Sequence, residues 1–337
     1  MKRALIFVSL IFASAAMPAA AQKATAPVQP KPLPGIAQKT AGMQKVPGFF
    51  TYYWDAREGK IWLQIDKWNT EFLYVESLPN GVGSNDIGLD RGQPGETQVV
   101  HFERSGPRVL LVAANERYRA VTDHLAQVEA VKQAFAQSVL WGFDAAAESG
   151  DAVLVDATPF FLRDGHNVAG KLKMTHQGAY HLDPSRCAIY LPRTKNFPDN
   201  TEVEATLTFI GDNPGPWVRQ VTPDPRDITV HDHYSFVQSP PPGFHVREYD
   251  PRSGFFGIQY MDFAAPVDKP IHKRFIVHFR LEKKDPTAAI GEPVKPIIYY
   301  VDRAAPEPIR SALVEGASWW NQAFTAAGYK DAFQVKV

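Results

Sequence analysis

The chain has 337 residues, of which 45% are hydrophobic and 12% aromatic, so it can bury a sizeable core in one large domain or two smaller ones. Lys plus Arg and Asp plus Glu both total 36. This balance argues against a nucleic-acid or anionic-membrane partner that is bound through bulk electrostatics.

The first 21 residues have the layout of a secretory signal peptide. Lys2 and Arg3 precede an apolar run over 4–16, and the alanines at 19–21 form a small-x-small cleavage site before Gln22. The apolar run is too short for a stable membrane anchor, and no other stretch approaches the ~20 apolar residues of a transmembrane helix. We therefore expect an exported protein, periplasmic, extracellular or on the outer surface, with no transmembrane segment.

Residues 22–45 predict a flexible linker, because they are rich in Ala, Lys, Gln and Pro and have no apolar periodicity. From residue 46 the pattern changes to apolar runs with aromatic and β-branched residues, which is typical of strands. The predicted strands include KIWLQI (60–65), FLYVESL (72–78), TQVVHFER (97–104), RVLLVAAN (108–115), DAVLVDATPFFL (151–162), TEVEATLTFI (201–210) and HKRFIVHFRLEKKDP (272–286). Asn80 and Gly81 favour a tight turn, and Ser-Gly-Pro at 105–107 favours a hairpin.

The segment 201–210 has the clearest two-residue alternation in the chain. Its inward positions are Val203, Ala205, Leu207 and Phe209, whereas Glu202, Glu204, Thr206 and Thr208 are expected to face water. One long helix is predicted between Thr122 and Leu140, where apolar residues recur every three or four positions. The segment 211–254 is crowded with prolines and predicts mostly loop, where binding functions are often found.

The segment GHNVAGKL is the nearest approach to a phosphate-binding loop. Gly165, Gly170 and Lys171 have the required spacing, but Leu172 stands where a hydroxyl must meet magnesium. The following residues, 173–178, have no helical pattern that would supply a helix N-terminus for phosphate. We therefore interpret the match as a coincidence.

Other catalytic signals are weak. Cys187 is the only cysteine, so it has no disulfide partner within the chain and is expected to be a small buried hydrophobe. Glu202 and Glu204 lie on a strand face that is predicted to be solvated, which gives no indication of a glycosidase pair. No Gly-x-Ser-x-Gly nucleophile motif is present in the sequence.

The segment HDHYSF is the weak candidate for a metal site. His231 and His233 are two residues apart, so on a strand they would point to the same side and could both reach one metal. Asp232, His245 or Asp250 could complete such a site. The alternative is a pair of ordinary surface or hydrogen-bonding histidines. No histidine is followed by glutamate, so the His-Glu-x-x-His motif of zinc peptidases is absent and we expect no catalytic residue and no cofactor in this chain.

The last forty residues predict a strand, a helix and a second strand. Pro306 and Pro308 suit the first turn of the helix, Glu307 suits its positive end, and Gly328 suits a left-handed stop. Its apolar face consists of Ile309, Leu313, Ala317, Trp320 and Phe324. Strand, helix, strand is how an α/β domain starts, and such a face must bury itself. We therefore expect the partner surface of this helix to lie outside the chain.

Several segments, in their order along the chain, resemble bacterial secreted zinc-dependent metalloproteases of the metzincin-like kind, which carry a β-rich domain of unknown function before the catalytic domain. These segments are VVHFER (99–104), VLLVAANERYRA (109–120), FAQSVLWGF (135–143), DPRSGFFGIQYMDF (250–263), FIVHFRLEKKDP (275–286) and residues 295–333. The resemblance covers most of residues 45–337. It implies that the first strand and helix of the protease domain begin at 296, and that the zinc-binding helix and the zinc belong to the full-length family member.

These observations predict an α+β chain. A predominantly antiparallel β domain with one long helix is expected over 46–288, followed by the start of an incomplete metzincin-like α/β domain over 296–337. The leading hypothesis is the non-catalytic N-terminal region of an exported zinc-dependent metalloendopeptidase, whose partners are the remainder of the catalytic domain and a peptide or protein substrate. One alternative is a self-sufficient periplasmic or surface binding module for a peptide or glycan. Another is a small hydrolase or metal site around His231 and His233.

Overall fold

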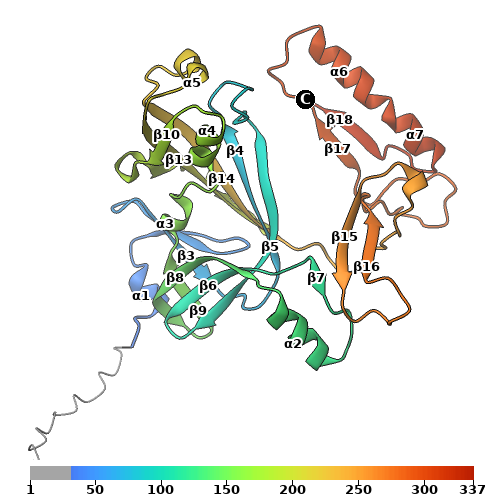
Figure 1. Cartoon of the computed structure of the whole chain (residues 1–337), viewed down its shortest axis with the longest axis horizontal. Coiled ribbons are helices and arrows are strands. Elements are labelled where there is room, and N and C mark those ends of the chain that lie inside the picture. The colour runs from blue at the N-terminus through green and yellow to red at the C-terminus, as the bar shows by residue number, and fades with distance from the viewer. Residues whose placement is uncertain (1–31) are drawn as a thin grey trace, which may run out of the picture.

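The computed structural model describes residues 32–337, so the predicted signal peptide and the first part of the predicted linker lie outside the described residues. Figure 1 shows two lobes joined side by side. We call residues 32–238, apart from the projecting segment 118–134, the sheet lobe, and residues 239–337 the C-terminal lobe. Over residues 32–337, no helix is both long enough and apolar enough to span a membrane.

A single antiparallel sheet of 13 strands forms the sheet lobe, and its strands follow the order β1-β2-β3-β9-β8-β6-β5-β4-β14-β13-β10, with β11 and β12 paired to β13. The strands are β1 (Gln44–Val46), β2 (Tyr52–Asp55), β3 (Lys60–Ile65), β4 (Phe72–Asn80), β5 (Gln93–Ser105), β6 (Arg108–Ala113), β8 (Ser138–Ser149), β9 (Ala152–Asp156), β10 (Ala179–Leu182), β11 (Ala188–Ile189), β12 (Lys195–Asn196), β13 (Asn200–Asp212) and β14 (Asp227–Gln238). The sheet curves until its two ends nearly meet, which makes it barrel-like (Figure 1). Hydrogen bonds connect these ends, from Phe49 N to Phe197 O at 2.8 Å and from Asn196 Nδ2 to Phe50 O at 2.8 Å.

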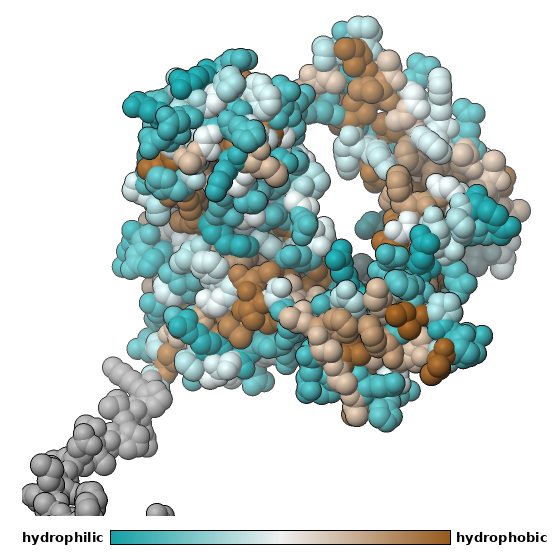
Figure 2. Space-filling view, viewed as in Figure 1, coloured by the Kyte–Doolittle hydropathy of each residue, from teal (hydrophilic) through white to brown (hydrophobic). Residues whose placement is uncertain are grey.

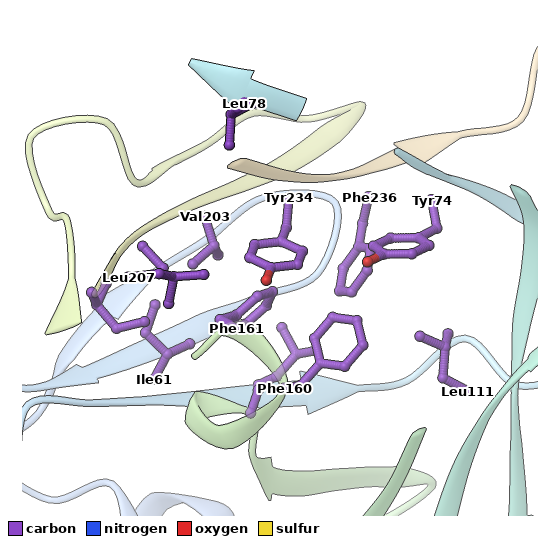
Figure 3. Packing of buried hydrophobic residues seen from close by; sticks show 14 of the residues in the cluster. Ile61, Tyr74, Leu78, Leu111, Phe160, Phe161, Val203, Leu207, Tyr234 and Phe236 are labelled. Carbon is purple, nitrogen blue, oxygen red and sulfur yellow. The ribbon is translucent and has the colours of Figure 1, made fainter. Parts of the chain in front are cut away.

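The interior of the curved sheet is filled by aromatic side chains. Figure 3 shows Phe160 and Phe161, on the short helix α3 (Thr158–Phe161), directed toward Tyr234 and Phe236 of β14. The ring centroids of Phe161 and Tyr234 are 5.5 Å apart, and those of Phe160 and Phe236 are 6.0 Å apart. Full burial of such a side chain contributes about 1.5–3 kcal/mol to folding, so this aromatic cluster contributes substantially to the stability of the lobe.

Most predicted strands are confirmed, including the hairpin at Ser105–Gly106–Pro107, where Gly106 has a φ of 58°. The inward positions of β13 are all buried as predicted. The expectation that Glu204 and Thr208 face water is wrong, because they are only 2% and 5% exposed. Glu204 lies beneath the segment that carries Tyr190 and Thr194. The tight turn after Asn80 is also wrong, since β4 continues to Asn80 and a longer loop leads to β5.

The predicted loop over 211–254 is largely incorrect. It contains α5 (Pro216–Val221) and the long strand β14, which lies between β4 and β13. None of the prolines lies within β14, so its hydrogen-bonding pattern is intact, and Pro216 begins α5. The alternation within β14 is interrupted at Asp232, an inward-facing carboxylate, and this hides the strand pattern.

Three further expectations are corrected by tertiary packing. Part of the predicted linker forms α1 (Ile36–Lys39), and Ile36 is buried against the sheet in a small cluster with Trp62 and Leu154. The long helix is shorter than predicted, since α2 (Leu125–Ala134) ends before Leu140, which belongs to β8, and α2 has no buried residue. The phosphate-loop-like segment is itself largely helical, because α4 (Val168–Met174) begins inside it, and only Lys173 and Met174 of the residues predicted to be non-helical belong to this helix.

The C-terminal lobe contains two small sheets. One has the order β16-β15-β7, from β7 (Tyr118–Arg119), β15 (Gly257–Asp262) and β16 (His272–Ile276). The other is the parallel pair β17 (Ile297–Tyr300) and β18 (Phe333–Lys336), connected through α6 (Ile309–Ser318) and α7 (Trp320–Ala326). The predicted strand-helix-strand order is therefore confirmed, although the helix is divided at Trp319. Gly328 has the expected left-handed φ, 90°.

The protein is thus mostly antiparallel β with few helices, which agrees with the coarse α+β prediction. The projecting segment 118–134 connects to the C-terminal lobe through the pairing of β7 with β15, and the two lobes also contact each other through an ion pair between Arg91 and Asp302.

Candidate functional site

A pair of β-bulges disturbs the sheet where β4 runs between β5 and β14. In the β4–β5 ladder, Gly95 and Glu96 lie opposite the single residue Glu76. In the β14–β4 ladder, the register shifts between His231 and His233, so Asp232 lies at the irregularity. Bulges change the direction of a side chain and are common beside functional sites. Here they place two carboxylates, on Glu76 and Asp232, in the same part of the sheet.

Asp232 is a carboxylate enclosed by the core. It is fully buried, its Oδ2 accepts a hydrogen bond from the backbone N of His166 at 3.2 Å, and its Oδ1 has no hydrogen-bond partner. Burial, and after it repulsion by Glu76, raises the pKa of Asp232 to about 7. A buried carboxyl group that is only half satisfied costs stability, so such groups are more common at functional sites than in ordinary cores.

Arg163 lies beside these carboxylates. Its guanidinium group stacks on the Phe160 ring at 4.6 Å, and its Nη2 donates to the Tyr74 hydroxyl at 2.8 Å. The Tyr74 hydroxyl contacts Glu76 Oε2 at 3.4 Å. Burial raises the pKa of Glu76, although the nearby Arg163 opposes this shift. Burial also raises the pKa of Tyr74, so its hydroxyl stays protonated and serves as a hydrogen-bonding group.

The loop between α3 and α4 brings Arg163 and His166 to this place. Asp164 caps α4, because its two carboxylate oxygens accept from the backbone N of Val168 at 2.7 Å and of Ala169 at 3.0 Å. Gly165 is required by close approach, since a Cβ there would lie 2.8 Å from the Tyr234 ring and 2.9 Å from Asp232 Oδ2. The carboxylate of Asp164 also occupies the helix start that a phosphate would need, which agrees with the rejection of a phosphate-binding loop.

A cavity of about 560 Å³ opens over the bulge. It is lined by Tyr74, Glu76, Pro94, Gly95, Glu96, Gln98, Leu140, Arg163, Gly165, His166 and Asn167. Two of the lining side chains have buried nitrogen atoms without a partner, Arg163 Nε and His166 Nδ1. Its size is that of ordinary ligand pockets, and it combines charged, polar and apolar walls. The arrangement is suited to binding a polar ligand.

The predicted metal candidates lie on the other face of β14. His231 Nδ1 and His233 Nδ1 both contact Glu204, at 2.8 and 3.1 Å, and His233 Nε2 contacts Glu202 at 2.8 Å. Ser235 also donates to Glu202. The two histidines therefore share one side, as the spacing predicted, but three of their four ring nitrogens contact carboxylates and His231 Nε2 contacts the Thr206 hydroxyl at 3.4 Å. Between residues 32 and 337, no cluster of three or more His, Cys, Asp or Glu side chains is arranged to hold a metal ion.

The pKa values in this polar ladder are shifted by its hydrogen bonds. Burial lowers the pKa of His233, but hydrogen bonds to Glu202 and Glu204 outweigh burial and raise it to about 9. For Glu202 and Glu204, burial raises the pKa, but the bonds from the histidines outweigh it and lower the pKa of both. A protonated His233 between two ionised carboxylates is thus the stable arrangement, which holds β13 and β14 together.

The remaining candidate residues are not brought to this ladder. Asp232 points to the opposite face of β14, into the core. Asp250 binds Arg252 and caps a short turn at Pro251–Ser253 in the C-terminal lobe, where His245 also lies. Cys187 was expected to be buried but is only half-buried, packed against the core with its Sγ 3.1 Å from Asp183 O.

The C-terminal lobe has a different kind of surface. Trp319 and Trp320 are 63% and 62% exposed, Leu313 is 50% exposed, and α6 and α7 have no buried residue. Figure 2 shows hydrophobic side chains gathered on this lobe where Figure 1 places α6, β17 and β18. A second cavity of about 560 Å³, mostly apolar, lies beside α7 and is lined in part by Phe244, Phe255, Val277, Phe279 and Phe324.

The sequence did not indicate this polar cavity, although it offered Asp232 as a possible metal ligand and Gly165 as part of the phosphate-loop-like segment. Glu76 and Arg163 line the cavity, and Asp232 lies behind its wall. They come from three distant segments, and only the fold brings them together. One local signal was available, because Asp232 interrupts an otherwise apolar set of inward positions at Val230, Tyr234 and Phe236.

The fold and the cavity define a predominantly antiparallel β protein with a polar pocket at a sheet bulge. The chain belongs to the family described as Domain of unknown function (DUF5117), whose family model matches residues 92–284, more than half of the chain. No curated protein and no solved structure matches the chain.

Proposed function

We propose that this chain is the non-catalytic N-terminal region of an exported zinc-dependent metalloendopeptidase, and that the catalytic domain packs on the apolar surface of α6 and α7. The observation that carries the proposal is the exposure of Leu313, Trp319 and Trp320 on the β17-α6-α7-β18 unit. Large adjoining apolar side chains in water mark an interaction surface. The resemblance of residues 295–333 to the start of a metzincin-like domain supports a protease domain as the partner.

The small size of the C-terminal sheet also supports a missing packing partner. Parallel strands normally occur in sheets that are covered on both faces, and an isolated pair of strands is marginally stable. In the pair β17 and β18 only Ile297 is buried, and the neighbouring Ala332 is the other buried residue of this unit. A catalytic domain that adds strands and covers the helices would complete the core.

We place the catalytic zinc of the proposed endopeptidase in the partner domain. The ring nitrogens of His231 and His233 that face the ladder are already hydrogen-bonded to carboxylates, and no His-Glu-x-x-His motif is present. The proposal therefore assigns zinc and hydrolysis to the partner domain. We expect the purified chain to hold no stoichiometric zinc and to leave casein uncleaved.

The test starts with the DNA that follows codon 337, where the proposal expects an encoded His-Glu-x-x-His motif in one of the three frames. The encoded segment is then co-expressed with the chain and isolated through a tag on the chain. We expect a complex that cleaves casein, and we expect Trp320→Asp to disrupt it. The matched control is Val267→Asp, which places the same charge on a fully exposed loop residue of the same lobe. A missing motif, or a complex that Trp320→Asp leaves intact, would count against the proposal.

A second candidate function is a self-sufficient binding module for a peptide or glycan. The polar cavity lined by Glu76 and Arg163 favours it. Limited proteolysis separates the two candidates, because a self-sufficient module predicts that residues 296–337 resist digestion as well as the sheet lobe does. The endopeptidase proposal predicts that this segment is cut first and is protected by the partner.

A further inference from the structure

The polar cavity carries an excess of negative charge. Glu76 and Glu96 both line it, and neither forms an ion pair with any residue in the range 32–337. The only lysine or arginine in the lining is Arg163, which already donates to Tyr74 and stacks on Phe160. The cavity lining therefore has two carboxyl groups and only one guanidinium group to balance their charge.

A third carboxylate lies directly behind the cavity wall. Asp232 Oδ2 is hydrogen-bonded to the backbone of His166, a lining residue, and is in close approach to Gly165, another lining residue. Its Oδ1 is buried without a partner. After burial, repulsion by Glu76 contributes to the raised pKa of Asp232, and repulsion by Asp164 and Glu96 contributes to the raised pKa of Glu76. A bound cation would relieve this repulsion.

The other walls indicate the form of the cation. Pro94 and Leu140 provide apolar contact for a methylene chain, as the stems of lysine and arginine require. Arg163 Nε and His166 Nδ1 lie in the wall without partners, and a peptide carbonyl group is a suitable acceptor for an N–H of Arg163. A lysine or arginine residue of a polypeptide supplies both a methylene chain for the apolar walls and a carbonyl acceptor for Arg163. A simple amine supplies only the methylene chain.

We infer that this cavity binds a lysine or arginine side chain of a polypeptide, with the cationic head facing Glu76 and Glu96. The inference rests on the sheet lobe alone, not on the proposed endopeptidase. One variant distinguishes this inference from the endopeptidase proposal. Trp320→Asp is expected to remove the catalytic-domain complex and to leave binding in the cavity unchanged.

The test is calorimetric titration of the purified chain with N-acetyl-L-lysine amide and N-acetyl-L-arginine amide. N-acetyl-L-norleucine amide is the uncharged control, N-acetyl-L-glutamate amide the anionic control, and putrescine the amine without a peptide group. We expect the basic amides to bind about tenfold or more tightly than norleucine amide, and putrescine to bind more weakly than lysine amide. If putrescine binds as tightly as the lysine amide or more tightly, the inference that the ligand is part of a polypeptide is wrong. Tighter binding of the glutamate amide would overturn the cationic site.

Two variants connect the binding to the cavity. Glu96→Gln changes an exposed side chain without hydrogen bonds and leaves the fold intact, and Glu76→Gln changes the half-buried one. We expect Glu76→Gln to weaken binding of the lysine amide about tenfold and Glu96→Gln by a smaller factor. Glu129→Gln on the exposed helix α2 removes the same charge outside the cavity and is expected to have no effect. Affinity that both cavity variants leave unchanged, or no saturable binding up to about 10 mM ligand, would overturn the inference.

Discussion

The two faces of β14 differ in how completely their polar side chains are hydrogen-bonded. On the outer face, His231, His233 and Ser235 form a ladder with Glu202 and Glu204, in which each histidine binds a carboxylate. On the inner face, alternate positions of the same strand carry Asp232 among aromatic rings, with one of its oxygens unpartnered. The same strand therefore carries a satisfied polar network and a half-satisfied buried acid, one residue apart.

This contrast separates a structural role from a binding role. The outer ladder resembles a metal site in its residue types, yet its hydrogen bonds are made within the protein and stabilise the β13–β14 pair. The inner acid is destabilising where it stands, and it lies against a cavity with further unpartnered groups. Residue type alone pointed to the outer face, whereas hydrogen-bond satisfaction points to the inner one.

The largest effect on stability is expected from a substitution among the apolar residues on the inner face of β14. Phe236→Ala removes a fully buried ring that contacts Phe72, Phe102 and Phe160, so it should lower the free energy of unfolding of the sheet lobe by about 3–5 kcal/mol. The measurement is urea unfolding followed by circular dichroism. Phe256→Ala is the control, because Phe256 is 90% exposed and should change stability by less than about 0.5 kcal/mol. Similar losses for both variants would contradict the assignment of the core.

A smaller effect of opposite sign, an increase in stability, is expected for Asp232→Asn. Its pKa is about 7 when folded and near 3.8 when unfolded, so the folded state keeps a proton that the unfolded state loses. Stability should therefore fall as pH rises from about 4 to 7, and Asp232→Asn should abolish this fall. At pH 8 we expect Asp232→Asn to stabilise the chain by on the order of 2 kcal/mol, and by less at pH 5.

Urea unfolding at the two pH values measures this difference. Asp212→Asn, at the exposed end of β13, removes a carboxylate outside the core and should have little effect at either pH. If Asp232→Asn instead destabilises the chain at pH 8, the carboxylate has a favourable partner and the contrast between the two faces is lost.

The smallest effect is expected on the outer face. The pKa of His233 is raised to about 9 in the folded state from 6.5, so its stabilising contribution is complete below about pH 6.5 and is lost as pH rises through 9. The depressed pKa values of Glu202 and Glu204 make their contribution complete above about pH 4.5, and it is lost as pH falls. We expect His233→Gln to remove on the order of 1 kcal/mol at pH 6 and less at pH 10.

Unfolding midpoints from pH 5 to pH 10 test this dependence. His181→Gln, an exposed histidine on β10, is the matched control and should leave the pH profile of the wild-type chain unchanged. An identical profile for His233→Gln and wild type would show that the ladder does not hold β13 to β14.

Local sequence patterns were sufficient for several elements. The alternation at 201–210 identified β13 and its buried face, and Gly106 identified the hairpin between β5 and β6. Pattern failed where one residue broke it, as at Asp232 in β14, and where a distant segment covered a polar side chain, as Tyr190 and Thr194 do for Glu204. The division of the C-terminal helix at Trp319 was also missed.

The sequence by itself determined the strand-rich character of this protein, the positions of most strands and the apolar face of the last helix, because side-chain periodicity depends only on neighbours along the chain. Tertiary structure alone decided which polar groups are satisfied. Glu76, Arg163 and Asp232 meet because β4, the loop after α3 and β14 become neighbours in the curved sheet. Burial and hydrogen bonding of these groups depend on contacts between distant segments, so the polar cavity exists only once the chain has folded.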